Sequence, residues 1–345
     1  MGTLRLLLAF AVVIAHTKPI HGFIGIGGTA AVKAFFVISG FYMHLVLDTK
    51  YAGRPALFYL NRALRLYPVY ALLLMLMAAF AVFHITYLDG GHSDYSMRRA
   101  FDGSPGSLLA LVPNFLIVGA DWVRLFLVNT ATGELSLGRL GADMNGQFAV
   151  EGYLFAPQMW SVSNEIAFYL VAPFIARLRL PLFTLALAAA WLLFYQASQS
   201  PLFWRSLLPQ ANFIFFALGM AAYRLMPLYR KLPRAALLPV AAIAFACLFT
   251  NGELNSGQTK YLVFVWLPYI LSIPALFLLS QRGRVDRFIG DLSYPVYVSH
   301  YLFAVSNPQG NTAALIVMAL ATAFAVVAVL AVDRPVERLR HALSR

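Results

Sequence analysis

Long apolar runs separated by short basic loops constrain the fold of this chain more than any other feature. Eleven such runs lie between residue 4 and residue 332. A transmembrane helix needs about 20 apolar residues, and fewer when its end residues snorkel. The runs therefore predict an all-α polytopic membrane protein. They span residues 4–16, 24–47, 66–88, 105–120, 160–178, 181–197, 208–226, 235–250, 261–280, 288–305 and 311–332.

The composition agrees with a membrane protein and argues against nucleic-acid binding. Hydrophobic residues make up 61% of the 345 positions and charged residues only 12%, whereas a soluble domain is usually about a quarter charged. The net charge of +12 would indicate a nucleic-acid partner in a soluble protein. Because the basic residues cluster between apolar runs, membrane topology is the simpler cause, and lipid is the expected partner.

The positions of the basic residues predict the topology. If the run 105–120 does not fully cross the bilayer, 18 basic residues fall on the cytoplasmic side and 7 on the outer side, while Lys33 stays within the membrane. This asymmetry follows the positive-inside rule. We therefore expect about ten transmembrane helices in a single domain covering residues 1–345, with both termini cytoplasmic. Residues 89–159 become an outer-face excursion that dips back towards the bilayer, and no soluble C-terminal domain is expected.

Four segments break the apolar pattern with polar groups that a simple anchor does not need. The first run has Arg5 and His16 eleven positions apart, which on an α-helix places them about 16 Å apart in depth. The second run contains Lys33, and Glu165 lies about one and a half turns into the fifth. Arg62 and Arg65 stand at i, i+3 beside the third run. Charged side chains within a bilayer are costly, so we treat these residues as functional candidates.

Six short motifs in a fixed order resemble the membrane-bound acyltransferase family 3, the O-acetyltransferases of bacterial surface glycans. They cover residues 4–337, nearly the whole chain. The motifs are Arg-X10-His (Arg5, His16), FFVISGF (35–41), the Arg-X-X-Arg pair with a following Tyr-Pro (Arg62, Arg65, Tyr67, Pro68), WSVSNEIAFYLVAP (160–173), LSYPVYVSH (292–300) and a closing Arg-Pro (Arg334, Pro335).

The resemblance implies about ten helices in the bacterial cytoplasmic (inner) membrane. It also implies an acyl-coenzyme A donor, most simply acetyl-CoA, on the cytoplasmic side and a glycan or glycolipid hydroxyl as acceptor outside. The chain departs from the family in two ways. Lys33 stands where many relatives carry an acid, and the esterase-like C-terminal domain of some relatives is not expected here.

The candidate residues suggest roles that agree with a donor on the cytoplasmic side and an acceptor on the outer side. Arg62 and Arg65 share one helix face and suit donor phosphates, with Arg5 as a third cation. His16 is the candidate general base, and Glu165 is the candidate to orient it and stabilise its charged form. Lys33, Ser39 or Tyr169 would supply the oxyanion donor. His300 is a further candidate for the wall of the site.

Simpler interpretations stand beside each role. Arg5 serves equally as a topology anchor, Lys33 as a snorkelling side chain, and His300 as a helix cap. Ser39-Gly40 favours close helix packing over a nucleophile. The histidines lack metal-ligand spacing, so no metal is expected. Direct transfer and a covalent acyl-histidine both remain open. A transporter or flippase of lipid-linked saccharides is the alternative function, although no repeated half with broken helices is evident.

Overall fold

The computed structural model describes residues 1–17, 20, 22–23, 25–87, 101–138, 146–199, 209–250, 262–305 and 312–343. These residues form two compact units that interleave along the chain. Unit 1 holds Met1–Leu73, Ala172–Arg179 and Ile214–Arg345, and unit 2 holds Leu74–Val171 and Leu180–Phe213. The sequence did not indicate this division, and the assignment of one domain stays a prediction.

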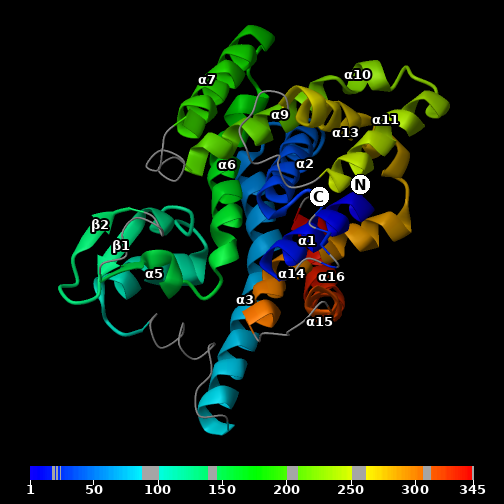
Figure 1. Ribbon diagram of the computed structural model, residues 1–345. Helices are drawn as coiled ribbons and strands as arrows, with labels where there is room; N and C mark the ends of the chain where they lie inside the picture. Colours follow the sequence, from blue (N-terminus) through cyan, green and yellow to red (C-terminus); the bar gives the residue numbers. More distant parts are fainter. Residues whose placement is uncertain are drawn as a thin grey trace. The chain divides into compact units, whose positions relative to one another are not determined.

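Unit 1 is built around a group of closely packed helices. Helix α1 (Gly2–His16) packs against α14 (Arg284–Val305) and α2 (Gly28–Thr49), and α14 packs against α15 (Ala313–Ala328) (Figure 1). The core between α1, α14 and α15 consists mainly of Ala and Val residues, and small residues allow close approach of helices in membrane proteins. Its buried members include Ala9, Val13, Val296, Val317, Ala321 and Ala325.

The other elements of unit 1 extend this bundle. Helix α11 (Arg234–Ala246) packs against α13 (Leu267–Ser280), and α16 (Arg334–Leu343) continues the chain after α15. The remaining elements are α9 (Phe213–Arg224), α10 (Met226–Tyr229), the short 3-10 helix η5 (Cys247–Phe249) and the π-helical turns η7 (Leu262–Trp266) and η8 (Val329–Asp333).

Three described helices contribute to both units, although α9 contributes only Phe213 to unit 2. Helix α3 (Pro55–Tyr87) changes unit after Leu73, and α6 (Trp160–Ala176) changes unit after Val171. The sequence predicted an apolar segment at 66–88, yet the helix begins at Pro55. The first turns carry Arg62 and Arg65, which end the apolar run without ending the helix. Both arginines are therefore helical residues, as their i, i+3 spacing requires.

Every predicted apolar run corresponds to a helix, but fewer helices meet a strict length test. Four described helices are long and apolar enough to cross a membrane: Gly28–Thr49, Pro55–Phe80, Pro157–Ala176 and Ala313–Arg340. Five further apolar helices are shorter. A membrane protein is thus supported, while the count of ten spanning helices and the cytoplasmic termini stay predictions. Of the seven basic residues expected outside, only Arg124 lies among the described residues.

Unit 2 contains a small sheet that an all-α fold does not include. Strands β1 (Phe126–Asn129), β2 (Leu135–Leu137) and β3 (Gln147–Ala149) pair antiparallel in the order β2-β1-β3. Strands of three or four residues are too short for a clear periodicity, so the sequence did not reveal them. The unit also contains α5 (Pro105–Leu116), α7 (Leu180–Gln199) and the 3-10 turns η1 (Val123–Leu125), η2 (Val150–Tyr153), η3 (Pro157–Met159) and η4 (Pro209–Asn212).

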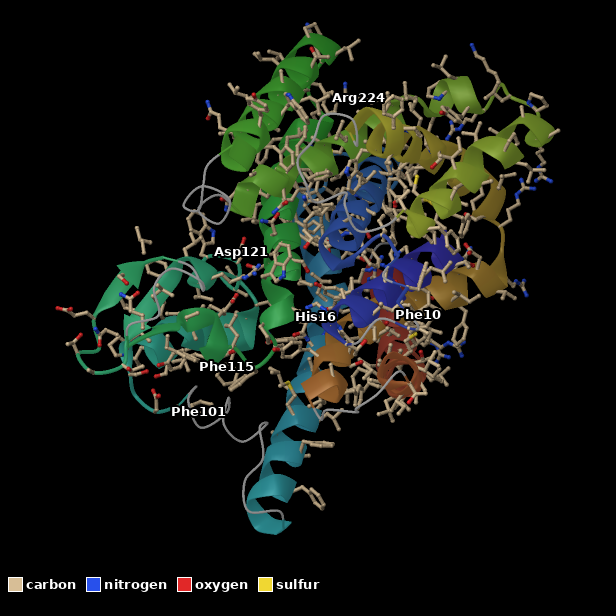
Figure 2. All side chains as sticks on the ribbon, in the orientation of Figure 1. Phe10, His16, Phe101, Phe115, Asp121 and Arg224 are labelled. Atoms are coloured by element: carbon tan, nitrogen blue, oxygen red, sulfur yellow. The ribbon has the colours of Figure 1, made fainter. Side chains whose placement is uncertain are left out.

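Helix α5 carries an exposed apolar face within the predicted excursion. Ser104 caps the helix by accepting a hydrogen bond from the Ser107 amide, and Pro105 starts it. The opposite face exposes Leu108, Val112 and Phe115, the last of which is labelled in Figure 2. Twelve residues extend about 18 Å, short of the hydrocarbon thickness of about 30 Å. This length favours the predicted partial entry into the bilayer. Residues 89–100 and 139–145 of the excursion lie outside the described part of the chain.

Candidate active site

His16 ends α1 with an exposed ring in a defined tautomer (Figure 2). Its Nδ1 lies 2.9 Å from the carbonyl oxygen of Val12, one turn earlier. A carbonyl oxygen only accepts hydrogen bonds, so Nδ1 carries a proton, and in the neutral ring the lone pair is on Nε2. A general base or a nucleophile needs such a nitrogen. In unit 1, a backbone carbonyl therefore provides the orienting contact that the sequence analysis assigned to Glu165.

His300 lies against His16 on the neighbouring helix α14. The ring centroids of His16 and His300 are 5.0 Å apart, and the planes are inclined by 51°. His300 is fully buried, and its Nδ1 donates to the carbonyl oxygen of Tyr297 at 2.6 Å. Its Nε2 is buried without a hydrogen-bond partner among the described residues. Tyr301 presents its ring edge-on to His16 at 6.0 Å. His300 and Tyr301 thus form an aromatic wall beside His16.

The three predicted arginines lie in unit 1 and share electrostatic neighbours. The positive charges of Arg5 and Arg65 both interact electrostatically with Tyr42 and with Asp291. Arg62 is only 6% exposed, and its guanidinium lies 5.4 Å from the centre of the Phe58 ring. Arg5 and His16 occupy opposite ends of the same helix. The cationic candidates are therefore grouped, and α1 connects their neighbourhood with His16.

The two candidates on α2 have different surroundings. Lys33 is half-buried, and its Nζ lies 5.4 Å from the centre of the Phe215 ring on α9. This cation–π contact lowers the cost of a charge in an apolar helix. Ser39 is half-buried directly before Gly40. A Cβ added to Gly40 would lie 1.9 Å from the carbonyl oxygen of Phe216, so this glycine permits direct contact between helix backbones.

Glu165 and Tyr169 lie in unit 2 as a hydrogen-bonded pair. They are four residues apart on α6, and the Tyr169 hydroxyl donates to Glu165 Oε1 at 2.6 Å. Glu165 is half-buried, whereas Tyr169 is only 4% exposed. The tyrosine therefore fixes the carboxylate and occupies one of its oxygens. Because Glu165 and His16 belong to different units, their predicted interaction stays a prediction.

Asp121 is a buried acid that the sequence analysis did not single out. Ser163 donates to its Oδ1 at 2.7 Å, and Asn164 donates to its Oδ2 at 3.4 Å. The Gly119 amide donates in turn to the Ser163 hydroxyl at 2.9 Å. Burial raises the pKa of Asp121, although these hydrogen bonds oppose the shift. The network attaches the excursion to α6 immediately before Glu165. The only sequence signal was the polar triplet Ser163, Asn164 and Glu165 in an apolar helix.

Arg124 makes a second attachment to the start of α6. Its Nε donates to Glu151 Oε2 at 2.7 Å, and its guanidinium lies 4.9 Å from the centre of the Trp160 ring. Asn114 adds a third connection within the excursion, donating to the carbonyl of Tyr153 and accepting from the amide of Phe155. The excursion and the first turn of α6 therefore form one connected structure.

Comparison with known proteins adds one finding. A family described as an acyltransferase domain matches residues 2–332 of this chain. No curated protein and no solved structure matches the chain significantly. Among the residues that the structure describes, no group of three His, Cys, Asp or Glu side chains is placed to hold a metal ion.

Proposed function

Since the chain belongs to this acyltransferase family, we propose that it transfers an acyl group from cytoplasmic acyl-CoA to a hydroxyl of a cell-surface or exported saccharide. Acetyl is the proposed group and the bacterial inner membrane the proposed location. The observation that carries the proposal is His16, whose Nδ1 hydrogen is held by Val12 and whose Nε2 lone pair is available for proton transfer.

The direct reaction uses His16 as general base. The acceptor hydroxyl oxygen attacks the thioester carbonyl carbon while its proton moves to His16 Nε2. The carbon–sulfur bond then breaks, and the coenzyme A thiolate takes the proton from the His16 imidazolium. The Val12 carbonyl keeps its hydrogen bond to Nδ1 throughout, so the ring holds one orientation in both protonation states.

The aromatic wall supports this role of His16. His300 and Tyr301 limit the rotation of the imidazole, and a fixed base loses less entropy on reaching the transition state. The same lone pair would also attack the thioester in an acyl-histidine route. In both routes His16 Nε2 is the reacting atom.

Arg5, Arg62 and Arg65 are proposed to bind the phosphates of the donor. Guanidinium groups bind phosphate through paired N–H donors. The position of Arg5 at the opposite end of α1 from His16 leaves a separation of about 16 Å for the donor's pantetheine arm. Glu165, fixed by Tyr169, is proposed to act with His16 on the acceptor side.

The test uses purified protein in lipid nanodiscs with acetyl-CoA labelled in the acetyl group and extracted glycan. Label that enters the glycan as an alkali-labile ester supports the proposal. Movement of a lipid-linked saccharide without acylation would instead support the transporter alternative. Mass spectrometry and NMR of surface glycans from strains with and without the gene would identify the acceptor hydroxyl.

A further inference from the structure

A contact between α3 and α16 adds two residues to the surroundings of Arg62. Arg340 on α16 donates through Nε to Asn61 Oδ1 at 2.6 Å. Asn61 immediately precedes Arg62 and is only 1% exposed. Neither Asn61 nor Arg340 is among the candidate site residues predicted from the sequence. The contact brings the C-terminal helix to the arginine pair that is proposed to bind the donor.

Two further guanidinium groups, those of Arg62 and Arg65, exert an electrostatic effect on Arg340. Like charges so placed repel one another, and the repulsion is stronger where water is partly excluded. Such a group is more stable when an anion binds among its members.

Acidic side chains surround part of this group. Asp291 on α14 interacts electrostatically with Arg65 and Arg5. Asp333 on η8 interacts in the same way with Arg65 and Arg340. Glu337 acts on Arg340 from within α16. These carboxylates partly compensate the positive charge, but among the described residues none provides the hydrogen bond that Asn61 Nδ2 needs.

Asn61 holds an amide donor that the described structure does not satisfy. Its Oδ1 accepts from Arg340, while its Nδ2 is buried without a hydrogen-bond partner among the described residues. Buried amide groups are almost always paired, so an unsatisfied one requires an explanation. Guanidinium groups are donors only and cannot satisfy it. What this neighbourhood needs is an acceptor with several negatively charged oxygens.

We propose that Asn61 and Arg340 complete, with Arg62, a binding site for the phosphate groups of the acyl donor. This inference rests on the proposed function. A phosphate carries enough acceptor oxygens for both a guanidinium and the Asn61 amide. In this proposal Arg340 has a double role, because its Nε orients Asn61 and its terminal nitrogens bind phosphate. The C-terminal helix α16 is then part of the donor site.

Direct binding of coenzyme A provides the test. Wild-type protein and the Arg340→Gln variant are compared in nanodiscs of zwitterionic lipid by calorimetry, with coenzyme A, 3′-dephospho-coenzyme A and phosphate-free pantetheine. Arg340→Gln is expected to raise the Kd for coenzyme A about tenfold, as for a lost charge-assisted contact, and to leave pantetheine binding unchanged. Arg338→Gln is the matched control, because Arg338 is an exposed arginine of the same helix.

The outcomes separate this inference from the proposed function. Unchanged coenzyme A affinity in Arg340→Gln would overturn the inference, whereas wild-type protein that does not bind coenzyme A at all would overturn the proposed function. If Arg340→Gln instead weakens only the binding of a soluble short-chain anionic phospholipid to the protein in zwitterionic nanodiscs, the phosphate belongs to a lipid headgroup and the donor assignment is wrong. Should Arg340→Gln fold poorly, Arg340→Lys keeps the charge without the paired donors and is expected to bind coenzyme A more weakly than wild type. Wild-type affinity in that variant would contradict the inference.

Discussion

His16 and His300 lie on neighbouring helices with ring centroids 5.0 Å apart, and each directs its Nδ1 hydrogen to a backbone carbonyl of its own helix. Both rings therefore have the same tautomer. The exposed ring of His16 is available for chemistry, while the buried ring of His300 restricts how His16 moves. The proposed general base thus has its orientation set before substrate binds.

Replacing His300 tests this restriction. His300→Ala removes the ring behind His16, and we expect kcat for acyl transfer to fall about tenfold, equivalent to about 1.4 kcal/mol in the barrier. His300→Phe keeps a ring of similar width and should recover most of the loss. Steady-state kinetics at saturating donor and acceptor measures both variants. If His300→Phe is as slow as His300→Ala, the rate depends on the Nε2 lone pair of His300 and not on the contact between the two rings.

Removing the hydroxyl of Tyr169 tests the support of Glu165. Tyr169→Phe deletes the 2.6 Å hydrogen bond to the carboxylate and keeps the packing. Loss of a bond to a charged group, worth about 1.5–3 kcal/mol, should lower kcat about tenfold or more when Glu165 acts in the reaction. Tyr195→Phe removes an exposed hydroxyl of α7 and is the control. Wild-type kcat in Tyr169→Phe would mean that Glu165 does not depend on its partner.

Asp286 contacts the first residues of α1, and its ionisation makes the stability of the fold depend on pH. It accepts hydrogen bonds from the amides of Gly2 and Thr3 and from the Thr3 hydroxyl, each at 2.8 Å. Burial alone would raise the pKa of Asp286, but the terminal amine of Met1 and these donors lower it well below its ordinary value. The stabilisation is therefore complete above the unfolded pKa of about 4 and is lost as the pH falls below it.

Asp286→Asn should accordingly lower the Tm at pH 7 and lower it less as the pH falls towards 3. Thermal unfolding in detergent, followed by intrinsic fluorescence, measures the difference from wild type at each pH. Glu134→Gln changes an exposed acid and is the control. A Tm difference that is constant between pH 7 and pH 3 would contradict the assigned role of Asp286.

Substitution of Gly40 on α2 or Gly219 on α9 should destabilise the fold, because the backbones of these two helices are in direct contact at these residues. A Cβ at Gly40 would lie 1.9 Å from the Phe216 carbonyl oxygen, and one at Gly219 would lie 2.0 Å from that of Val37. Such overlaps force the helices apart, so each alanine variant should reduce the folded yield severely, beyond the cost of about 1–3 kcal/mol typical of overpacking. Size-exclusion chromatography of a fluorescent fusion measures the yield.

Gly53→Ala separates this overlap from backbone strain. Gly53 has φ +74°, but nothing lies within 4 Å of an added Cβ. The Gly53→Ala variant should therefore lose only about 1–2 kcal/mol of folding free energy, the cost of a left-handed backbone conformation for a residue with a side chain. Equal losses at Gly40 and Gly53 would exclude helix contact as the cause.

The sequence predicted the helices better than their ends. Apolar runs locate a helix because only apolar segments are stable within the bilayer. A run ends at the first charged residue, but the backbone hydrogen bonds of the helix continue beyond that residue. For this reason α3 begins eleven residues before the predicted segment and includes Arg62 and Arg65. The sheet at 126–149 was missed because its strands are too short to show alternation.

The candidate site was predicted as residue types rather than as contacts. Charges within or next to apolar runs indicated Arg5, Arg62, Arg65 and Glu165 as candidates. The contact of His16 with His300 joins residues 284 positions apart, and that of Arg340 with Asn61 joins residues 279 apart. Such pairings depend on which helices become neighbours, and hydropathy does not specify that. Asp121 was missed for a related reason, because its partners lie more than forty residues away on α6.

The most direct test of the account is the His16→Ala variant in the nanodisc assay with labelled acetyl-CoA and glycan, alongside its coenzyme A affinity. We predict that acyl transfer falls at least a hundredfold, the scale of a lost general base, while the Kd for coenzyme A stays within about twofold because the arginines are retained. Acyl transfer within a few-fold of wild type would contradict the assignment of His16 as the reacting residue.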